Sequence, residues 1–400
     1  MSMSNGGRRG DRLSFVFLVA ATACLCLARP AVSAEFHLPP PVVDHVGTAQ
    51  IFTSHLKDPT VTFAAREFVW GDHQRPGGPW SAFRTTYIPF DREPDKTRDI
   101  DWYRAHEPDR MSWKCDQNSP ATSYKYDFGY LSPLDITSDA VRQDIFDRYV
   151  RPAAANGFDG VAFDNVSGTN YDQRCGTFHD SGWVQQFTGK RVDRAYTEAV
   201  RSWLKWMRDN AHVIGIATAA NIVFDPSDPT AYDIVAHEVD VVVDETGFSR
   251  KCSPSPIGKE WEAHFLALRR VAIQRGLVII DQACEKFVDI PENLVEWSLA
   301  NYHLLRGERT YLALVGLQEY GVFLDRPELS VRLGAPTRDP QRIGAAWMRR
   351  YEQGGVIVNP SADPLNFVLP PGAWNSLGGE LLPPTIQVDG QHAAIWVRGN

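Results

Sequence analysis

The chain has 400 residues, which is enough for one large hydrophobic core and a second small domain. Acidic residues outnumber basic ones by 49 to 41, and the net charge of −8 argues against nucleic acid or an anionic membrane as a partner. The sequence contains no phosphate-binding loop, dinucleotide fingerprint, Gly-x-Ser-x-Gly elbow or His-Glu-x-x-His motif. These absences argue against nucleotide-dependent enzymes, serine hydrolases of the elbow type and zinc proteases.

Residues 1–34 predict a secretory signal peptide. Three arginines precede an apolar run, Leu13–Leu27, and small residues at 32–34 fit a cleavage site after Ala34. An uncleaved membrane anchor is the alternative, although the run is short for one. Cleavage would remove four arginines and one aspartate and change the net charge from −8 to −11. We therefore expect a secreted protein, extracellular or periplasmic, with no further membrane span.

After a Pro-rich leader at 35–59, apolar β-rich runs alternate with amphipathic helices. This alternation predicts an α/β fold with a parallel sheet, and eight strands suffice for a (β/α)8 TIM barrel over residues 60–339. The third strand has the weakest pattern, and Asp127–Ile136 competes for its place. The expected strands are Val61–Val69, Thr85–Phe90, Arg110–Trp113, Gly160–Asp164, Val213–Ile222, Val239–Glu245, Leu277–Asp281 and Thr310–Val315.

The chain changes character at about residue 340. Residues 354–360 are typical of a strand closed by a turn, and Gly and Pro pairs punctuate short β segments to the end. We expect residues 340–400 to form a small antiparallel β domain.

The stretch 156–166 carries the most information about function. Gly157 suits a helix C-cap, Asp159-Gly160 is a turn signal, and Val161–Phe163 is an unbroken apolar run typical of a strand covered on both faces. Asp164 then ends the run. Because side chains at the C-terminal ends of barrel strands face the site, Asp164 is a candidate catalyst. The alternative is an acid that only caps a helix or binds a loop.

A second acid follows the sixth predicted strand. Adjacent residues of a strand point to opposite faces, so only one of Asp244 and Glu245 can point into the barrel mouth. Glu245 is later and longer, and we choose it as the partner of Asp164. The alternative is that Glu245 binds a neighbouring loop.

Two carboxylates without a metal or nucleotide motif suit glycoside hydrolysis, which requires one acid and one ionised carboxylate on the two sides of a sugar. A separation of about 5–5.5 Å would indicate a retaining mechanism and about 6.5–9.5 Å an inverting one; we expect retention. We expect no cofactor and no metal.

Further polar and aromatic residues at predicted strand ends are candidates for binding a sugar. Carboxylates and amides suit hydroxyl groups, and aromatic rings suit the C–H faces of sugars, although each aromatic is more often part of a core. The expected substrate-binding residues are Asn165, Asn221, Glu67, Asp91, Asp281, Trp113 and Tyr171.

Four cysteines remain after the signal segment, and an even number in an exported protein suggests disulfides. Their spacing does not resemble a zinc site. Because the cysteines follow predicted strands 3 and 4, and 6 and 7, we expect the bridges Cys115–Cys175 and Cys252–Cys284, out of three possible connectivities.

The segment Gly157–Val166 resembles the strand-4 signature of TIM-barrel glycoside hydrolases, the group that includes relatives of endo-α-1,4-polygalactosaminidase. Leu134–Thr137 resembles the lead-in to that strand, and Arg350–Pro360 resembles the C-terminal β segment of those proteins. The resemblance spans about residues 60–365. It implies that Asp164 is the nucleophile and Glu245 the acid/base.

The sequence therefore predicts a secreted glycosidase that acts on an extracellular or cell-wall polysaccharide as a monomer. Two alternatives stay open. One is a non-catalytic carbohydrate-binding barrel, and the other is a different carboxylate-dependent hydrolase or lyase, because a fold does not fix a function.

Overall fold

The computed structural model describes residues 36–52, 66–72, 82–122, 131–317, 319 and 326–399. The predicted signal segment, residues 1–34, lies outside them. Within these ranges no helix is both long enough and apolar enough to cross a membrane.

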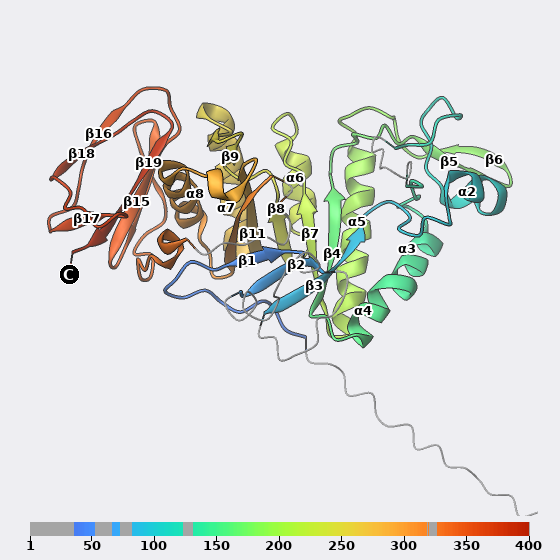
Figure 1. Cartoon of the computed structure of the whole chain (residues 1–400). Helices are drawn as coiled ribbons and strands as arrows, with labels where there is room; N and C mark the ends of the chain where they lie inside the picture. The colour runs from blue at the N-terminus through green and yellow to red at the C-terminus, as the bar shows by residue number, and fades with distance from the viewer. Residues whose placement is uncertain are drawn as a thin grey trace, which may run out of the picture. The chain divides into compact units, whose positions relative to one another are not determined.

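Eight parallel strands form the central sheet of the described chain (Figure 1). The order of the strands in the sheet follows their order in the sequence, and the backbone of Gly47 accepts a hydrogen bond from Leu312 N at 2.8 Å, which joins the first strand to the last. The sheet therefore closes into the predicted TIM barrel. Its strands are β1 (Ala49–Ile51), β2 (Phe68–Asp72), β3 (Phe83–Pro89), β4 (Gly160–Val166), β7 (Ala217–Ile222), β8 (Val241–Asp244), β11 (Gly276–Cys284) and β12 (Thr310–Gly316).

Helices connect most of the strands and cover the outside of the barrel. The longest, α5, begins after Asp193, whose carboxylate accepts from the amides of Ala195 and Tyr196. The helices are α2 (Ile100–His106), α3 (Asp139–Ile145), α4 (Arg151–Ala155), α5 (Arg194–Val213), α6 (Pro229–Ala236), α7 (Gly258–Gln274) and α8 (Glu292–Leu305), with short turns η1 (Pro108–Arg110), η2 (Phe146–Val150), η3 (Phe287–Asp289) and η4 (Pro327–Ser330). Two small hairpins, β5 (Gly176–His179) with β6 (Gly182–Gln185) and β9 (Ser249–Arg250) with β10 (Ser253–Pro254), project from the loops.

The expected third strand is wrong. Met111 and Trp113 make only isolated bridges in the β3–β4 connection, and in the competing segment 127–136 the described part, from Leu131, adds isolated bridges alone. The barrel still has eight strands, because β1 is a strand that the sequence did not predict; it lies in the predicted Pro-rich leader at 35–59. Three residues are too short a run for hydrophobic periodicity to reveal, so β1 carries no strand signal in the sequence.

Alternation along the strands separates two cores. Every second strand residue points into the barrel and packs with its equivalents from other strands, among them Phe83, Ala162, Ala219, Val243 and Ile280. The residues between them pack outward against the helices. This period of two decides which side chains reach the barrel mouth.

The C-terminal residues form an antiparallel β domain, as expected, coloured red in Figure 1. Its main sheet packs against α8, and Glu296 of that helix accepts a hydrogen bond from Ile395 N at 2.8 Å. The strands are β13 (Gln341–Ile343), β14 (Ala346–Tyr351), β15 (Gly354–Asn359), β19 (His392–Arg398) and β17 (Trp374–Ser376), with β16 (Leu365–Val368) and β18 (Thr385–Val388) as a separate pair.

The structure pairs the cysteines as predicted. Cys115 bonds Cys175 with their Cα atoms 5.1 Å apart, and Cys252 bonds Cys284 with their Cα atoms 4.5 Å apart. Cys115 does not follow a barrel strand, but it lies in the β3–β4 connection, next to the β4–β7 connection that carries Cys175. The pairing therefore holds although the strand assignment behind it was partly wrong.

Replacing Cys115 and Cys175 together by serine should lower the free energy of unfolding by about 4 kcal/mol, because the bridge closes a 60-residue loop in the unfolded chain. Denaturant unfolding of the double variant measures this loss. The Cys252 and Cys284 pair, which closes 32 residues, is the matched control and should cost slightly less. An unchanged unfolding midpoint would contradict the bridge.

Candidate active site

Strand alternation brings five polar side chains to the mouth of the barrel. Four of them lie two residues after a strand side chain that packs inside the barrel, and Tyr87 lies four residues after Phe83, so all five point to the interior side of their strands. Four of the five are partly exposed, and Asn221 is 5% exposed. The five are Tyr87 of β3, Asp164 of β4, Asn221 of β7, Glu245 directly after β8 and Gln282 of β11.

The side-chain amide of Asn221 joins the two candidate carboxylates. Its Nδ2 donates to Asp164 Oδ1 at 2.9 Å and to Glu245 Oε2 at 2.7 Å. Two oxygens bonded to one nitrogen can be no farther apart than the two bonds laid end to end, about 5.6 Å. The structure thus brings together Asp164, Glu245 and Asn221, which the sequence had singled out separately.

Asp164 has two further donors. The hydroxyl of Tyr87 and the amide of Asn165 each donate to Asp164 Oδ2 at 2.8 Å. Asn165 has a positive φ of 59°, which breaks the alternation and turns its side chain back onto Asp164. Together with Asn221, these groups give Asp164 three neutral donors, which suit an ionised carboxylate because it only accepts.

Glu245, not Asp244, reaches the mouth. Its Oε1 accepts from Gln282 Nε2 at 2.9 Å, in addition to the bond from Asn221. Asp244 points outward, is 1% exposed, and its carboxylate lies 3.2 Å from His264 Nε2. The choice between these adjacent acids, made on alternation, agrees with where the structure places them.

Asp281 does not join the other candidates. Its carboxylate accepts from the hydroxyl of Ser249 and from Ser298 Oγ, the latter at 2.6 Å, and it is fully buried on the helix side of β11. The next residue, Gln282, faces the barrel mouth instead. The expectation that Asp281 binds substrate is therefore corrected, since it lies on the wrong face of its strand.

Burial raises the pKa of Asp281 to about 6, against the donors Ser249 and Ser298, which lower it. Because the folded state binds this proton more tightly than the unfolded state does, Asp281 lowers the stability as pH rises from about 4 to about 6. Asparagine does not titrate. The free energy of unfolding of Asp281→Asn, relative to that of the wild type, should therefore rise by about 3 kcal/mol when the pH is raised from 4 to 7.

Unfolding in denaturant at both pH values tests this prediction. A stability difference between Asp281→Asn and the wild type that does not change with pH would contradict it. An exposed carboxylate, Asp180→Asn, is the control and should leave the pH dependence unchanged.

Glu67 and Trp113 also lie away from the carboxylate pair. Glu67 precedes β2, at the N-terminal edge of the barrel, where it bonds Thr48 N at 2.8 Å and His45 Nε2 at 2.6 Å. Trp113 is buried in the β3–β4 connection, between Arg104 and Phe178. The corrections at Glu67 and Trp113 come from the strand assignment: the bounds of the first expected strand and the whole of the third were wrong.

Asp91 and Tyr171 line a cavity of about 370 Å³. Asp91 follows β3, and Tyr171 belongs to the loop after β4. Asn165, which bonds Asp164, lines the same cavity. The cavity therefore adjoins the candidate nucleophile on the β4 side.

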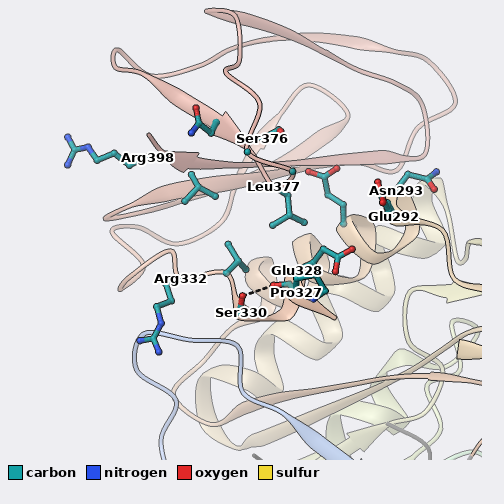
Figure 2. A pocket seen from close by; sticks show the side chains of 15 residues that line it. Glu292, Asn293, Pro327, Glu328, Ser330, Arg332, Ser376, Leu377 and Arg398 are labelled. Carbon is teal, nitrogen blue, oxygen red and sulfur yellow. Dashed lines mark hydrogen bonds between the residues drawn. The ribbon is translucent and has the colours of Figure 1, made fainter. Parts of the chain in front are cut away.

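A larger cavity, about 1040 Å³ in the described part of the chain, lies elsewhere. Figure 2 shows Glu292, Glu328, Arg332 and Arg398 around it, between α8, η4 and the C-terminal sheet. None of the predicted site residues lines this hollow. Size alone does not mark it as the site of chemistry, because the bridged carboxylates lie at the barrel mouth.

Within the described ranges, no group of three or more His, Cys, Asp or Glu residues is arranged to hold a metal ion.

Comparison with known proteins finds similarity in structure only. No protein-family model and no curated protein matches the chain. A solved structure of a trehalulose synthase variant with Tris matches with a TM-score of 0.50 and 11% identity, over 88% of this chain and 99% of that chain. Trehalulose synthase from Pseudomonas mesoacidophila MX-45 gives 0.48 at 10% identity, over 91% and 98%, and an α-amylase from Malbranchea cinnamomea gives 0.45 at 13%, over 79% and 74%. At such identity, the first match shows a shared fold.

The sequence analysis missed Gln282 and left Tyr87, one of several aromatic residues near predicted strand ends, outside the expected substrate-binding set. Gln282 follows Val278 and Ile280 at a spacing of two, and Tyr87 follows Phe83 and Thr85 in the same way. The same alternation that selected Glu245 would have found both.

Proposed function

We propose that the protein is a secreted glycoside hydrolase that cleaves a polysaccharide by a retaining, two-carboxylate mechanism. The observation that supports this most is the shared amide of Asn221. It keeps Asp164 Oδ1 and Glu245 Oε2 no more than about 5.6 Å apart, a limit that allows the separation of about 5–5.5 Å of retaining enzymes and lies below the 6.5–9.5 Å of inverting ones.

In the proposed first step, Asp164 attacks the anomeric carbon and the bond to the leaving oxygen breaks. Glu245 gives its proton to that oxygen, so the leaving sugar departs as an alcohol and a glycosyl ester forms on Asp164. In the second step Glu245 takes a proton from water, and the water oxygen attacks the same carbon and releases Asp164.

The neighbours of the pair have supporting roles. Asn221 and Gln282 fix Glu245, while Tyr87 and Asn165 fix Asp164, so that both carboxylates keep their orientation before substrate arrives. In this proposal Asn221 is a positioning residue more than the hydroxyl-binding residue that its sequence position suggested.

The sequence resemblance to relatives of endo-α-1,4-polygalactosaminidase and the fold shared with a trehalulose synthase favour a sugar substrate. The signal segment favours export. The first test is the release of reducing ends from a panel of α-galactosaminoglycans, α-glucans and α-galactans by the mature protein. Release from at least one supports the proposal.

Binding of a polysaccharide without release would favour the second candidate, a non-catalytic carbohydrate-binding barrel. The observation in its favour is that the amides of Asn221 and Gln282 already occupy oxygens of both carboxylates. An activity that a chelator abolishes would instead favour a different hydrolase.

A further inference from the structure

Three residues that line the cavity next to Asn165 belong to a buried network of four charges: Asp91, Arg92 and Asp172 line the cavity, and Arg174 is the fourth member. Arg92 lies 3.2 Å from Asp91 and 3.1 Å from Asp172, and Arg174 lies 2.9 Å from Asp91. All four side chains are at most 8% exposed. Such networks add little stability over apolar residues of the same volume, so the network calls for a reason other than stability.

The network is held rigidly in place. Arg174 donates to the carbonyls of Leu134 at 2.7 Å and Asp91 at 3.2 Å. The residue after it, Cys175, is fixed by the bridge to Cys115. The wall therefore offers polar groups in set positions, which is what recognition of a hydroxyl-rich ligand requires.

An aromatic ring completes the cavity. Tyr171 lines it and is 39% exposed, and the guanidinium of Arg191 lies 4.7 Å from the centre of its ring. Arg191 in turn pairs with Asp225 at 2.8 Å. The ring is held in place and lies beside the buried polar wall, a combination that suits a sugar with one apolar face and several hydroxyls.

The charged side chains that line the cavity are all paired. Asp91, Arg92 and Asp172 pair within the network that Arg174 completes, and Arg191 pairs with Asp225 next to Tyr171. Asp164, whose donors are neutral, does not itself line the cavity. An ionised substituent on a ligand would find each of these opposite charges already paired, and burying a charge without a partner is costly.

We propose that this cavity is the subsite for the sugar unit bound next to the cleaved bond, and that it selects an uncharged sugar over an amino sugar or a uronic acid. This inference rests on the proposed glycosidase function for its place in the reaction. It narrows the substrate, which the sequence left as an extracellular or cell-wall polysaccharide of unspecified sugar.

Binding of monosaccharides to the mature wild-type protein tests the subsite without any turnover. The probes are glucose and galactose, their 2-amino forms as cations and galacturonic acid as an anion, measured by saturation-transfer NMR and titration calorimetry. We expect a neutral sugar to bind at least about tenfold more tightly than its charged counterparts, and Tyr171→Ala to weaken it about tenfold. Tyr171→Phe, which keeps the ring, should bind within about threefold of the wild type.

Two control variants locate the binding. Asp180→Asn changes an exposed carboxylate outside the cavity, and Arg398→Ala changes the large cavity of Figure 2; neither should alter the affinity. Equal binding of charged sugars, loss of binding in Arg398→Ala but not in Tyr171→Ala, or no binding of a neutral sugar would each overturn the inference.

The outcomes separate this inference from the proposed function. Neutral sugar binding that depends on Tyr171, with no hydrolysis of any polysaccharide, keeps the subsite and removes the glycosidase. Hydrolysis whose KM is unchanged in Tyr171→Ala and in Asp172→Asn keeps the glycosidase and removes the subsite.

Discussion

Asp164→Asn is expected to abolish hydrolysis, lowering kcat by roughly 10⁴-fold or more, because the amide cannot form the glycosyl ester. Asparagine has nearly the shape of aspartate, and one side-chain oxygen remains to accept from the surrounding donors. Substrate binding should therefore survive. Initial rates on the best polysaccharide of the panel, with binding measured on the same protein, give both quantities.

The matched control is Asp180→Asn, which makes the same change at an exposed position and should keep full activity. Equal rates for Asp164→Asn and the wild type would remove Asp164 from the mechanism. Thermal unfolding of both variants shows whether a loss of activity is a loss of fold.

Glu245→Gln is expected to lower kcat by about 10²–10⁴-fold on a polysaccharide, because glutamine cannot protonate the leaving oxygen. The loss should be much smaller for the first step on an aryl glycoside whose leaving group needs no proton. That step releases the aryl alcohol in a burst, after which the glycosyl ester on Asp164 hydrolyses slowly. Stopped-flow absorbance separates the two phases.

Glu260→Gln, on the exposed face of α7, is the control for this substitution and should behave as the wild type. A loss of equal size on the polysaccharide and on the aryl glycoside would argue against Glu245 as the acid. A full rate on both would remove Glu245 from the mechanism altogether.

The sequence predicts the barrel because its long strands carry strong signals. In β4, β8, β11 and β12, apolar runs bounded by turn residues give position and type together. In β1, three residues inside a Pro-rich stretch give neither. It becomes a strand because the barrel offers it two neighbours, and that tertiary context is invisible in a local pattern.

The candidate site was predicted where alternation was applied and was missed where it was not. Alternation selected Glu245 over Asp244, and the structure places only Glu245 at the mouth. Applied to β11, it would have rejected Asp281 and found Gln282. The corrections at Glu67 and Trp113 instead trace to strand boundaries, which local sequence patterns define poorly.

The bridge made by Asn221 could not be read from the sequence at all. It depends on three strands, β4, β7 and β8, placing their ends within hydrogen-bond distance of one another. The limit on the separation of the carboxylates, which supports the retention expected from the sequence, follows only from that arrangement.

The configuration of the freshly formed product tests the central claim most directly. Proton NMR of the first minutes of hydrolysis distinguishes the anomers before they equilibrate. The proximity of Asp164 and Glu245 predicts a product with the same anomeric configuration as the cleaved bond. A product of the opposite configuration would contradict the covalent role of Asp164 and the retaining mechanism with it.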